Sequence, residues 1–291
     1  MHEKLKTISS IDEIHSLIKV LKKEGKTIGF VPTMGYLHEG HLSLVRESKK
    51  NNDLTFVSIF VNPKQFAPAE DLSTYPRDLD KDIKLLSELE TDYLFYPDTK
   101  DFYPNDFQTY VSVNEITKIL EGELRPTHFR GVTTVVAMLF NCVSPNNAYF
   151  GQKDAQQAAV IKQIVRDLKF DIKINICPIV RENDGLAMSS RNVFLNDKER
   201  LDALVLSRSL KLAEEIINEG EKETEKILSE MKKLINSVES SQLDYVSIVE
   251  TESFTIADKI ENDKSYYVLV ACKIGKTRLI DNNLLLNIFN P

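Results

Sequence analysis

The chain has 291 residues, of which 42% are hydrophobic and 28% charged, with 10 Gly and 10 Pro. This composition excludes a disordered or fibrous chain and supplies enough apolar residues for one large domain or two unequal domains. The formal net charge of -7 disfavours a general role in binding nucleic acid or an anionic membrane, so any anion site must be local.

The cysteines and the N-terminus bear on the cellular compartment. The three cysteines, Cys142, Cys177 and Cys272, form no CxxC pair, so we expect small buried residues in a reducing compartment. No apolar run follows the charges of residues 1–6, which argues against a signal peptide. No stretch reaches the roughly 18 apolar residues of a membrane span. We therefore expect a cytoplasmic protein with no membrane partner.

The first part of the chain predicts alternating helices and strands. Apolar residues at helical spacing follow Ser9 and Ser10, which are candidate N-caps, and near-continuous apolar runs are typical of strands covered on both faces. The expected elements are helix 11–21, strand 27–31, helix 40–50, strand 55–61, helix 78–89, strand 93–96, helix 132–143, strand 148–150, helix 154–168 and strand 173–178. This alternation predicts an α/β fold with a Rossmann-like, doubly wound parallel sheet.

The pattern changes after about Arg181. Long charged helices are expected at about 197–220 and 221–238. Strands are expected at 245–250, 266–273 and 277–281, the last two joined in a hairpin through Gly275. We therefore predict a Rossmann-like domain over residues 1–180 and a smaller α+β domain over residues 181–291.

The ten residues 32–41, PTMGYLHEGH, follow the first long strand and lead into a helix. In an open α/β sheet, ligands bind at the carboxyl ends of the strands, beside helix N-termini. Exposed N–H groups and the helix dipole at that position attract anions such as phosphates. His38 and His41 flank the helix N-terminus, where the dipole disfavours imidazolium, so we expect two neutral donors. The bare HxxH pattern would also suit two surface histidines in a turn, and two ligands are too few for a structural zinc site.

The whole string is more specific. It contains the HxGH signature of a nucleotidyltransferase superfamily, and with residues 32–35 it resembles the pantothenate synthetase family in particular. The strings NPKQF at 62–66, FGQKDAQQ at 150–157 and GLAMSSRN at 185–192 resemble the same family. The last is similar to the KMSKS loop of class I aminoacyl-tRNA synthetases, with Arg191 in place of the second lysine.

Each of these strings also has a local explanation. Asn62-Pro63 is a turn signal, and Asp154 with Gln157 resembles a capping box. Ser-Ser-Arg is typical of a polar loop. Gly151 and Lys153 fit less well, because a lysine at a helix start opposes the dipole unless an anionic ligand compensates it.

The resemblance implies an ATP-dependent ligase. Pantoate and ATP would give pantoyl-adenylate and pyrophosphate, and the β-alanine amine would then attack the acyl carbon to give pantothenate and AMP. The ATP site implied consists of Met34, Gly35, His38, His41, Gly151, Lys153, Asp154, Met188, Ser189, Ser190 and Arg191, of which His38, His41, Lys153 and Arg191 are expected to be catalytic. The pantoate site implied consists of Asn62, Gln65 and Gln157, with Met34 and Phe150 as apolar walls.

Further expectations concern metal, assembly and lids. Mg²⁺ is expected through the ATP phosphates, with no protein ligand assigned. The resemblance implies a homodimer, and residues 181–291 or the stretch 64–82 could act as a lid over the adenylate.

His128, Arg130 and Gly131 match the family pattern but equally suit structural pairing. Asp78, Asp80 and Asp82 are most simply a solvated first turn of a helix.

Two other readings remain open at this point. A different nucleotidyltransferase, making a dinucleotide or CDP product, would share HxGH and a basic loop. A catalytically silent nucleotide-binding module would bind ATP without releasing pyrophosphate. The absence of GxxxxGK[ST] and of GxGxxG after a strand argues against a P-loop kinase and a dinucleotide oxidoreductase.

Overall fold

The computed structural model describes residues 5–67 and 72–286. The chain forms two compact units. The first unit consists of Met1–Gly151 and Val160–Pro178, and the second of Gln152–Ala159 and Ile179–Pro291. The segment that carries Lys153 therefore belongs with the later part of the chain, whereas a single cut after residue 180 would assign it to the first unit.

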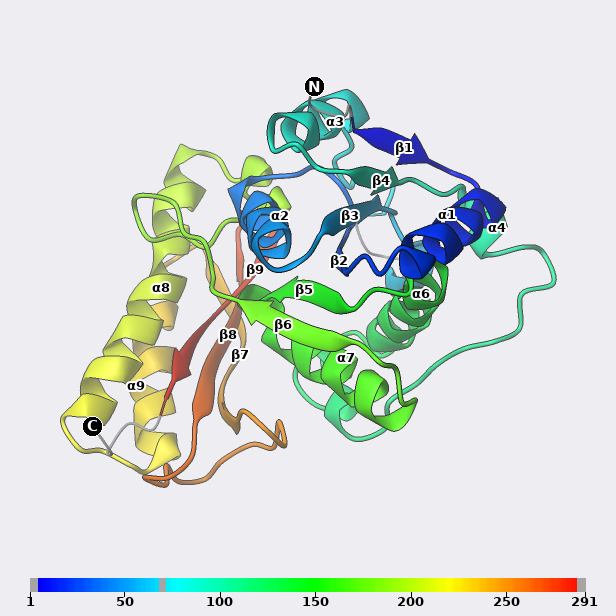
Figure 1. Cartoon of the computed structure of the whole chain (residues 1–291). Helices are drawn as coiled ribbons and strands as arrows, with labels where there is room; N and C mark the ends of the chain where they lie inside the picture. The colour runs from blue at the N-terminus through cyan, green and yellow to red at the C-terminus, as the bar shows by residue number, and fades with distance from the viewer. Residues whose placement is uncertain (1–4, 68–71, 287–291) are drawn as a thin grey trace. The chain divides into compact units, whose positions relative to one another are not determined.

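The first unit contains a six-stranded parallel sheet of order β1-β4-β3-β2-β5-β6. Its strands are β1 (Lys6–Ile8), β2 (Ile28–Thr33), β3 (Leu54–Ile59), β4 (Tyr93–Phe95), β5 (Asn147–Gly151) and β6 (Lys173–Cys177). Strand β2 lies between β3 and β5 (Figure 1), so the strand order reverses there. This reversal is the topological switch point of a doubly wound fold, and it confirms the predicted fold class. Only the short β1 was not predicted.

Helices cover both faces of this sheet. The helices of this unit are α1 (Ile11–Lys23), α2 (Glu39–Asn51), α3 (Leu79–Glu88), the short α4 (Thr99–Phe102) and α5 (Glu121–Leu124), α6 (His128–Val143) and the part of α7 (Ala155–Asp167) from Val160 onward, with short 3₁₀ turns η1 (Pro63–Gln65) and η2 (Ile116–Lys118). Phe30 and Phe56 pack with α1 and α6, whereas the next residues, Val31 and Val57, pack with α2 and α3. Side chains alternate along a strand, so near-continuous apolar runs supply both faces.

The second unit is an antiparallel three-stranded sheet with helices. Its elements are η3 (Gln152–Asp154), η4 (Ser190–Phe194), α8 (Asp197–Asn218), α9 (Thr224–Asn236), β7 (Ser241–Glu250), β8 (Tyr266–Ile274) and β9 (Thr277–Leu285). The strand order is β7-β8-β9, and Ile274 pairs with Thr277 around the turn, which confirms the predicted hairpin. Both β7 and β9 are longer than predicted, because their polar ends lack an apolar alternation.

Two further findings concern the cysteines and the hydrophobicity of the helices. Cys142, Cys177 and Cys272 are buried free thiols, as expected, and burial raises the pKa of each thiol to about 11. Such thiols are poor nucleophiles at neutral pH. Within the described residues, no helix is long and apolar enough to cross a membrane.

Candidate active site

The loop between β2 and α2 has an unusual backbone. Gly35 and Tyr36 both lie in the left-handed region, with φ of 82° and 52°. A Cβ atom on Gly35 would lie 3.0 Å from both the Asp82 carboxylate and the Ile59 side chain. Glycine therefore meets both the conformational and the packing requirement at this position.

Asp82 of α3 holds this loop from the side. Its carboxylate accepts hydrogen bonds from the backbone N–H of Tyr36 at 2.8 Å and of Leu37 at 2.7 Å. The residue is 1% exposed, so the expectation of a solvated acidic turn is wrong for Asp82. Burial raises its pKa, and the two backbone donors oppose the rise.

His38 and His41 form a reciprocal cap at the start of α2. His38 Nδ1 accepts from the Gly40 N–H at 3.2 Å, and His41 Nδ1 accepts from the His38 N–H at 3.4 Å. The ring centroids are 4.1 Å apart. Because each Nδ1 serves as an acceptor, this arrangement requires neutral imidazoles that carry the proton on Nε2. The helix-dipole argument predicts the same protonation state.

The turn after β3 holds its amides in a network. Asn62 donates through Nδ2 to Gln65 Oε1 at 3.0 Å and accepts from the Tyr103 hydroxyl at 2.8 Å. Gln65 Nε2 approaches the Met34 sulfur at 3.1 Å. The structure therefore brings together Met34, Asn62 and Gln65, three of the residues predicted for pantoate.

Helix α6 supports this turn through His128 and Gly131. His128 Nδ1 lies 3.0 Å from the Gln65 carbonyl oxygen, and the Gly131 carbonyl accepts from Asn62 Nδ2 at 3.0 Å. A Cβ atom on Gly131 would overlap the Lys64 carbonyl. Of the two alternatives for this motif, the contacts support structural pairing. Helix α6 begins at His128, four residues before the predicted start.

The carboxyl ends of β2, β3 and β5 meet at one edge of the sheet. The three strands are parallel neighbours, so the loops after Thr33 and Ile59 and the end of β5 at Gly151 share this edge. Phe150 itself is 6% exposed and packs edge-on against Phe140 at 6.4 Å between ring centroids. Its side chain is therefore part of the core beneath this edge.

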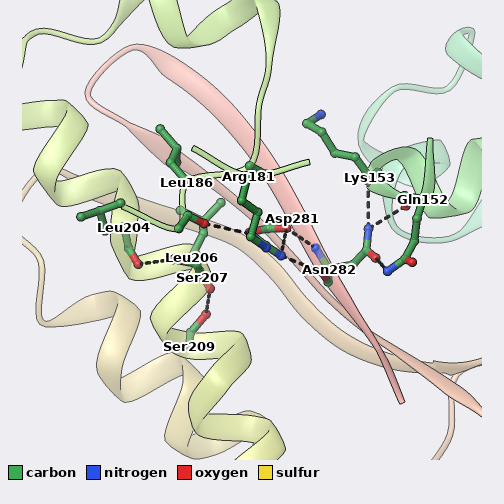
Figure 2. A network of polar contacts seen from close by, with 12 residues as sticks. Gln152, Lys153, Arg181, Leu186, Leu204, Leu206, Ser207, Ser209, Asp281 and Asn282 are labelled. Atoms are coloured by element: carbon green, nitrogen blue, oxygen red, sulfur yellow. Dashed lines mark hydrogen bonds and ion pairs between the residues drawn. The ribbon is translucent and has the colours of Figure 1, made fainter. Parts of the chain in front are cut away.

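In the second unit, Lys153 lies on the 3₁₀ turn η3. Its ammonium is 3.7 Å from Asp154 Oδ1, and its side chain is 21% exposed. The carbonyl groups of Gln152 and Lys153 both accept from Asn282 Nδ2 at 2.9 Å (Figure 2). Gln157, two residues into α7, is half-buried.

Backbone hydrogen bonds join the two ends of the loop that leads from Val180 to Met188. The string Ser189-Ser190-Arg191 follows directly. Met188 N–H donates to the Val180 carbonyl at 3.0 Å, and Arg181 bridges to Ala187. Ser189 caps η4 by accepting the Arg191 N–H at 3.3 Å, and Ser190 is 8% exposed. The Ser-Ser-Arg string therefore lies on an ordered turn, held at its base by backbone hydrogen bonds.

Comparison with known proteins decides the family. The pantoate-beta-alanine ligase family matches residues 6–284. The chain is 54% identical over 275 residues to the pantothenate synthetase of Caldicellulosiruptor bescii, which covers 94% of this chain and 97% of the relative. This chain belongs to the pantoate–β-alanine ligase family.

Solved structures agree with the assignment of this chain to the ligase family. Pantothenate synthetase from Thermus thermophilus is 41% identical with a TM-score of 0.90, over 98% of this chain and 100% of that one. Pantoate-beta-alanine ligase from Francisella tularensis, whose structure is described as complexed with beta-gamma ATP and beta-alanine, is 37% identical with a TM-score of 0.78. The match covers 96% of this chain and 97% of that one.

Sequence reasoning missed several residues that hold the ligase loops. Asp82, Tyr103 and Asn282 contact the predicted site strings from distant parts of the chain. The sequence pattern indicates Asp82 only as one of three acids at a helix start. The sequence carries no local signal for Asn282, which lies just beyond the predicted strand 277–281 and proves to be buried.

Proposed function

We propose that this ligase condenses pantoate with β-alanine at the expense of ATP, through a pantoyl-adenylate. A pantoate carboxylate oxygen attacks the α-phosphorus, the bond to the bridging oxygen breaks, and pyrophosphate leaves. The β-alanine amine then attacks the acyl carbon, loses a proton, and expels AMP. Both nucleophiles come from the substrates, so the protein has to position them and stabilise charge.

The observation that carries this proposal is the double histidine cap at the start of α2. The Nδ1 atoms of His38 and His41 accept backbone N–H groups, which assigns the ring protons to Nε2. Neutral donors at a helix N-terminus suit a phosphoryl group on which negative charge builds in the transition state. Asp82 fixes the backbone that leads into this cap.

The remaining ATP contacts are assigned by resemblance. We assign Lys153 and Arg191 to phosphate charge as catalytic groups, and the hydroxyls of Ser189 and Ser190 as donors. We assign Met34, Gly35, Gly151, Asp154 and Met188 to the nucleotide. The support is that Gly151 offers open space beside its backbone, because a Cβ atom there would meet no heavy atom within 4 Å.

Pantoate is assigned to the amides. We assign Gln65 and Gln157 to its hydroxyl and carboxylate groups, Asn62 to the support of Gln65, and Met34 to the methyl groups. The Asn62–Gln65 hydrogen bond and the Gln65–Met34 contact support a shared pantoate site. We assign Phe150, which packs edge-on against Phe140, as an apolar wall through the small part of its side chain that is exposed.

Magnesium is assigned to the substrate. Among residues 5–67 and 72–286, no group of three or more His, Cys, Asp or Glu side chains is arranged to hold a metal ion. We assign Mg²⁺ to the ATP phosphates, where it would neutralise charge on the leaving pyrophosphate. A homodimer, a cytoplasmic location, and lids formed by residues 181–291 or by the stretch 64–82 complete the proposal. Residues 68–71 of that stretch lie outside the described residues.

An isotope experiment tests the adenylate directly. Pantoate labelled with ¹⁸O in its carboxylate is incubated with ATP, Mg²⁺ and β-alanine, and the products are analysed by mass spectrometry. Transfer of one label to AMP, with pyrophosphate released, is the expected result. AMP without label, or formation of ADP and phosphate, would contradict the proposed route. Pyrophosphate release with another acceptor but not with pantoate would identify a different adenylating enzyme.

A further inference from the structure

Asn282 is a buried polar residue whose hydrogen bonds converge on η3 (Gln152–Asp154), which we call the Lys153 turn. It is 1% exposed and lies on β9, at the edge of the three-stranded sheet. Its Nδ2 donates to the carbonyl oxygens of Gln152 and Lys153, and its Oδ1 accepts from Gln152 Nε2 at 3.1 Å. One side chain therefore uses both donors and its acceptor on two consecutive residues.

The backbone of Asn282 is held just as fully. Its N–H donates to Asp281 Oδ1 at 2.8 Å, and its carbonyl accepts from Arg181 Nη2 at 3.3 Å. Arg181 and Asp281 form a bidentate pair of 2.6 and 3.0 Å, in which Asp281 is 3% exposed. Figure 2 shows Asp281 and Asn282 as adjacent links between Arg181 and Gln152.

The same arginine reaches the loop that carries the Ser-Ser-Arg string. Arg181 Nη1 donates to the Gly185 carbonyl at 3.1 Å, and Arg181 bridges in the backbone to Ala187. Polar contacts thus connect the Lys153 turn, β9 and the loop before Ser189 within the second unit. Bidentate arginine–carboxylate pairs are directional, so they fix position as well as charge.

The Lys153 turn needs support of this kind. It is a three-residue 3₁₀ turn, a conformation with poorer hydrogen-bond geometry than an α-helix. Gly151 precedes it, and a Cβ atom on Gly151 would meet no heavy atom within 4 Å. A displacement of about 1 Å in a charged group can cost on the order of 100-fold in rate.

We propose that Asn282 is a positioning residue for the ligase reaction, which sets the place of the Lys153 ammonium by holding the carbonyls of Gln152 and Lys153. The proposal rests on the role assigned to Lys153 under the proposed function. The Arg181–Asp281 pair in turn holds the backbone of Asn282. A purely structural Asn282 would affect the amount of folded protein and leave the chemistry of the folded enzyme unchanged.

A double-mutant cycle separates the two roles. Asn282→Ala should lower kcat for pyrophosphate release about tenfold to 100-fold, with a smaller change in KM for ATP. Lys153→Ala should lower kcat by about 10²–10³. In the Lys153→Ala background, Asn282→Ala should have an effect of less than about twofold, because its target is gone. Losses that multiply in the double variant would overturn the inference.

A matched control lies one residue away. Asn283 on β9 donates to Glu214 Oε2 at 2.9 Å and makes an exposed contact. Asn283→Ala should leave kcat unchanged, and a loss equal to that of Asn282→Ala would also overturn the inference. Circular dichroism and unfolding midpoints, measured for every variant, establish that the assays are made on folded protein.

An isosteric change gives a readout in pH. In Asn282→Asp an acceptor faces the two carbonyl groups, and protonation of the new carboxyl restores one donor. The ratio of variant to wild-type kcat should therefore rise as the pH falls, and a ratio independent of pH would contradict the hydrogen-bond role. A wild-type enzyme that releases no pyrophosphate with pantoate would overturn the proposed function itself. Wild-type activity with multiplicative losses overturns only the role of Asn282.

Discussion

The carboxylate of Asp82 lies 2.7 Å from the backbone nitrogen of Leu37, and it is the buried acceptor that shapes the loop before the histidine cap. The second oxygen accepts from Tyr36, whose left-handed backbone is otherwise unfavourable for a non-glycine residue. Lys81, the neighbour of Asp82, places its ammonium 5.2 Å from the Tyr36 ring centroid. Helix α3 therefore fixes a backbone that sequence alone assigns only to a turn.

Asp82→Asn should separate activity from stability. The amide keeps one acceptor but turns its NH₂ group towards the other backbone N–H, so the loop shifts and kcat should fall at least about tenfold. Loss of a hydrogen bond costs about 1–3 kcal/mol, and removal of a buried charge offsets part of that cost. The unfolding free energy at pH 7 should change by less than about 2 kcal/mol. Denaturant unfolding and pyrophosphate release check both, and unchanged kcat would contradict the role of Asp82.

The pH dependence of stability offers a second test of Asp82. Burial raises its pKa in the folded protein, so the folded state binds this proton more tightly than the unfolded state does. The contribution of Asp82 to stability is therefore largest below the unfolded pKa of about 3.9 and is lost as the pH rises through the folded pKa. The unfolding free energy of wild type minus that of Asp82→Asn should fall across this window. A difference that rises with pH would show that the donors outweigh burial.

His38→Asn should test whether the histidine does more than cap the helix. Asparagine is a good N-cap, so the Gly40 N–H keeps an acceptor and stability should stay within about 1 kcal/mol of wild type. The Nε2 donor is lost, and kcat should fall by about 10²–10³. His15→Asn on α1 is a matched control for loss of an imidazole. If His38→Asn retains full kcat, capping alone explains His38.

The sequence predicted the α/β layer and the family well, because both depend on local pattern. Strands such as β2 and β3 are covered on both faces and appear as apolar runs, and the HxGH string carries its own specificity. The contacts that hold the loops in place were not predicted, and the reason is physical. The Asp82–Leu37 and Asn282–Lys153 contacts span 45 and 129 residues, and no local pattern distinguishes a buried acid or amide from a solvated one.

The same limit applies to the ends of elements. The predicted third strand of the second unit ended at Asp281, whereas β9 continues through Asn282 to Leu285. A run of Asp and Asn is typical of a turn, because these side chains compete for backbone hydrogen bonds. Here Arg181 and the Lys153 turn supply those partners from outside the strand. Tertiary contacts therefore override a local preference at the residues that matter for the proposed site.

Gly131→Ala should show how closely α6 supports the turn at residues 62–66, which carries Gln65. A Cβ atom at this position would overlap the backbone of Lys64 and Gln65, so the turn has to move. Alanine gains about 1 kcal/mol of helix propensity, but overpacking against backbone costs about 1–3 kcal/mol, so we expect net destabilisation. Because Gln65 shifts with the turn, KM for pantoate should rise more than KM for ATP.

Gly151→Ala is the steric control, since its Cβ meets no heavy atom within 4 Å, and its unfolding midpoint should match wild type. Equal rises in both KM values for Gly131→Ala would instead indicate a general loss of folding, and unchanged values with unchanged stability would contradict the packing argument.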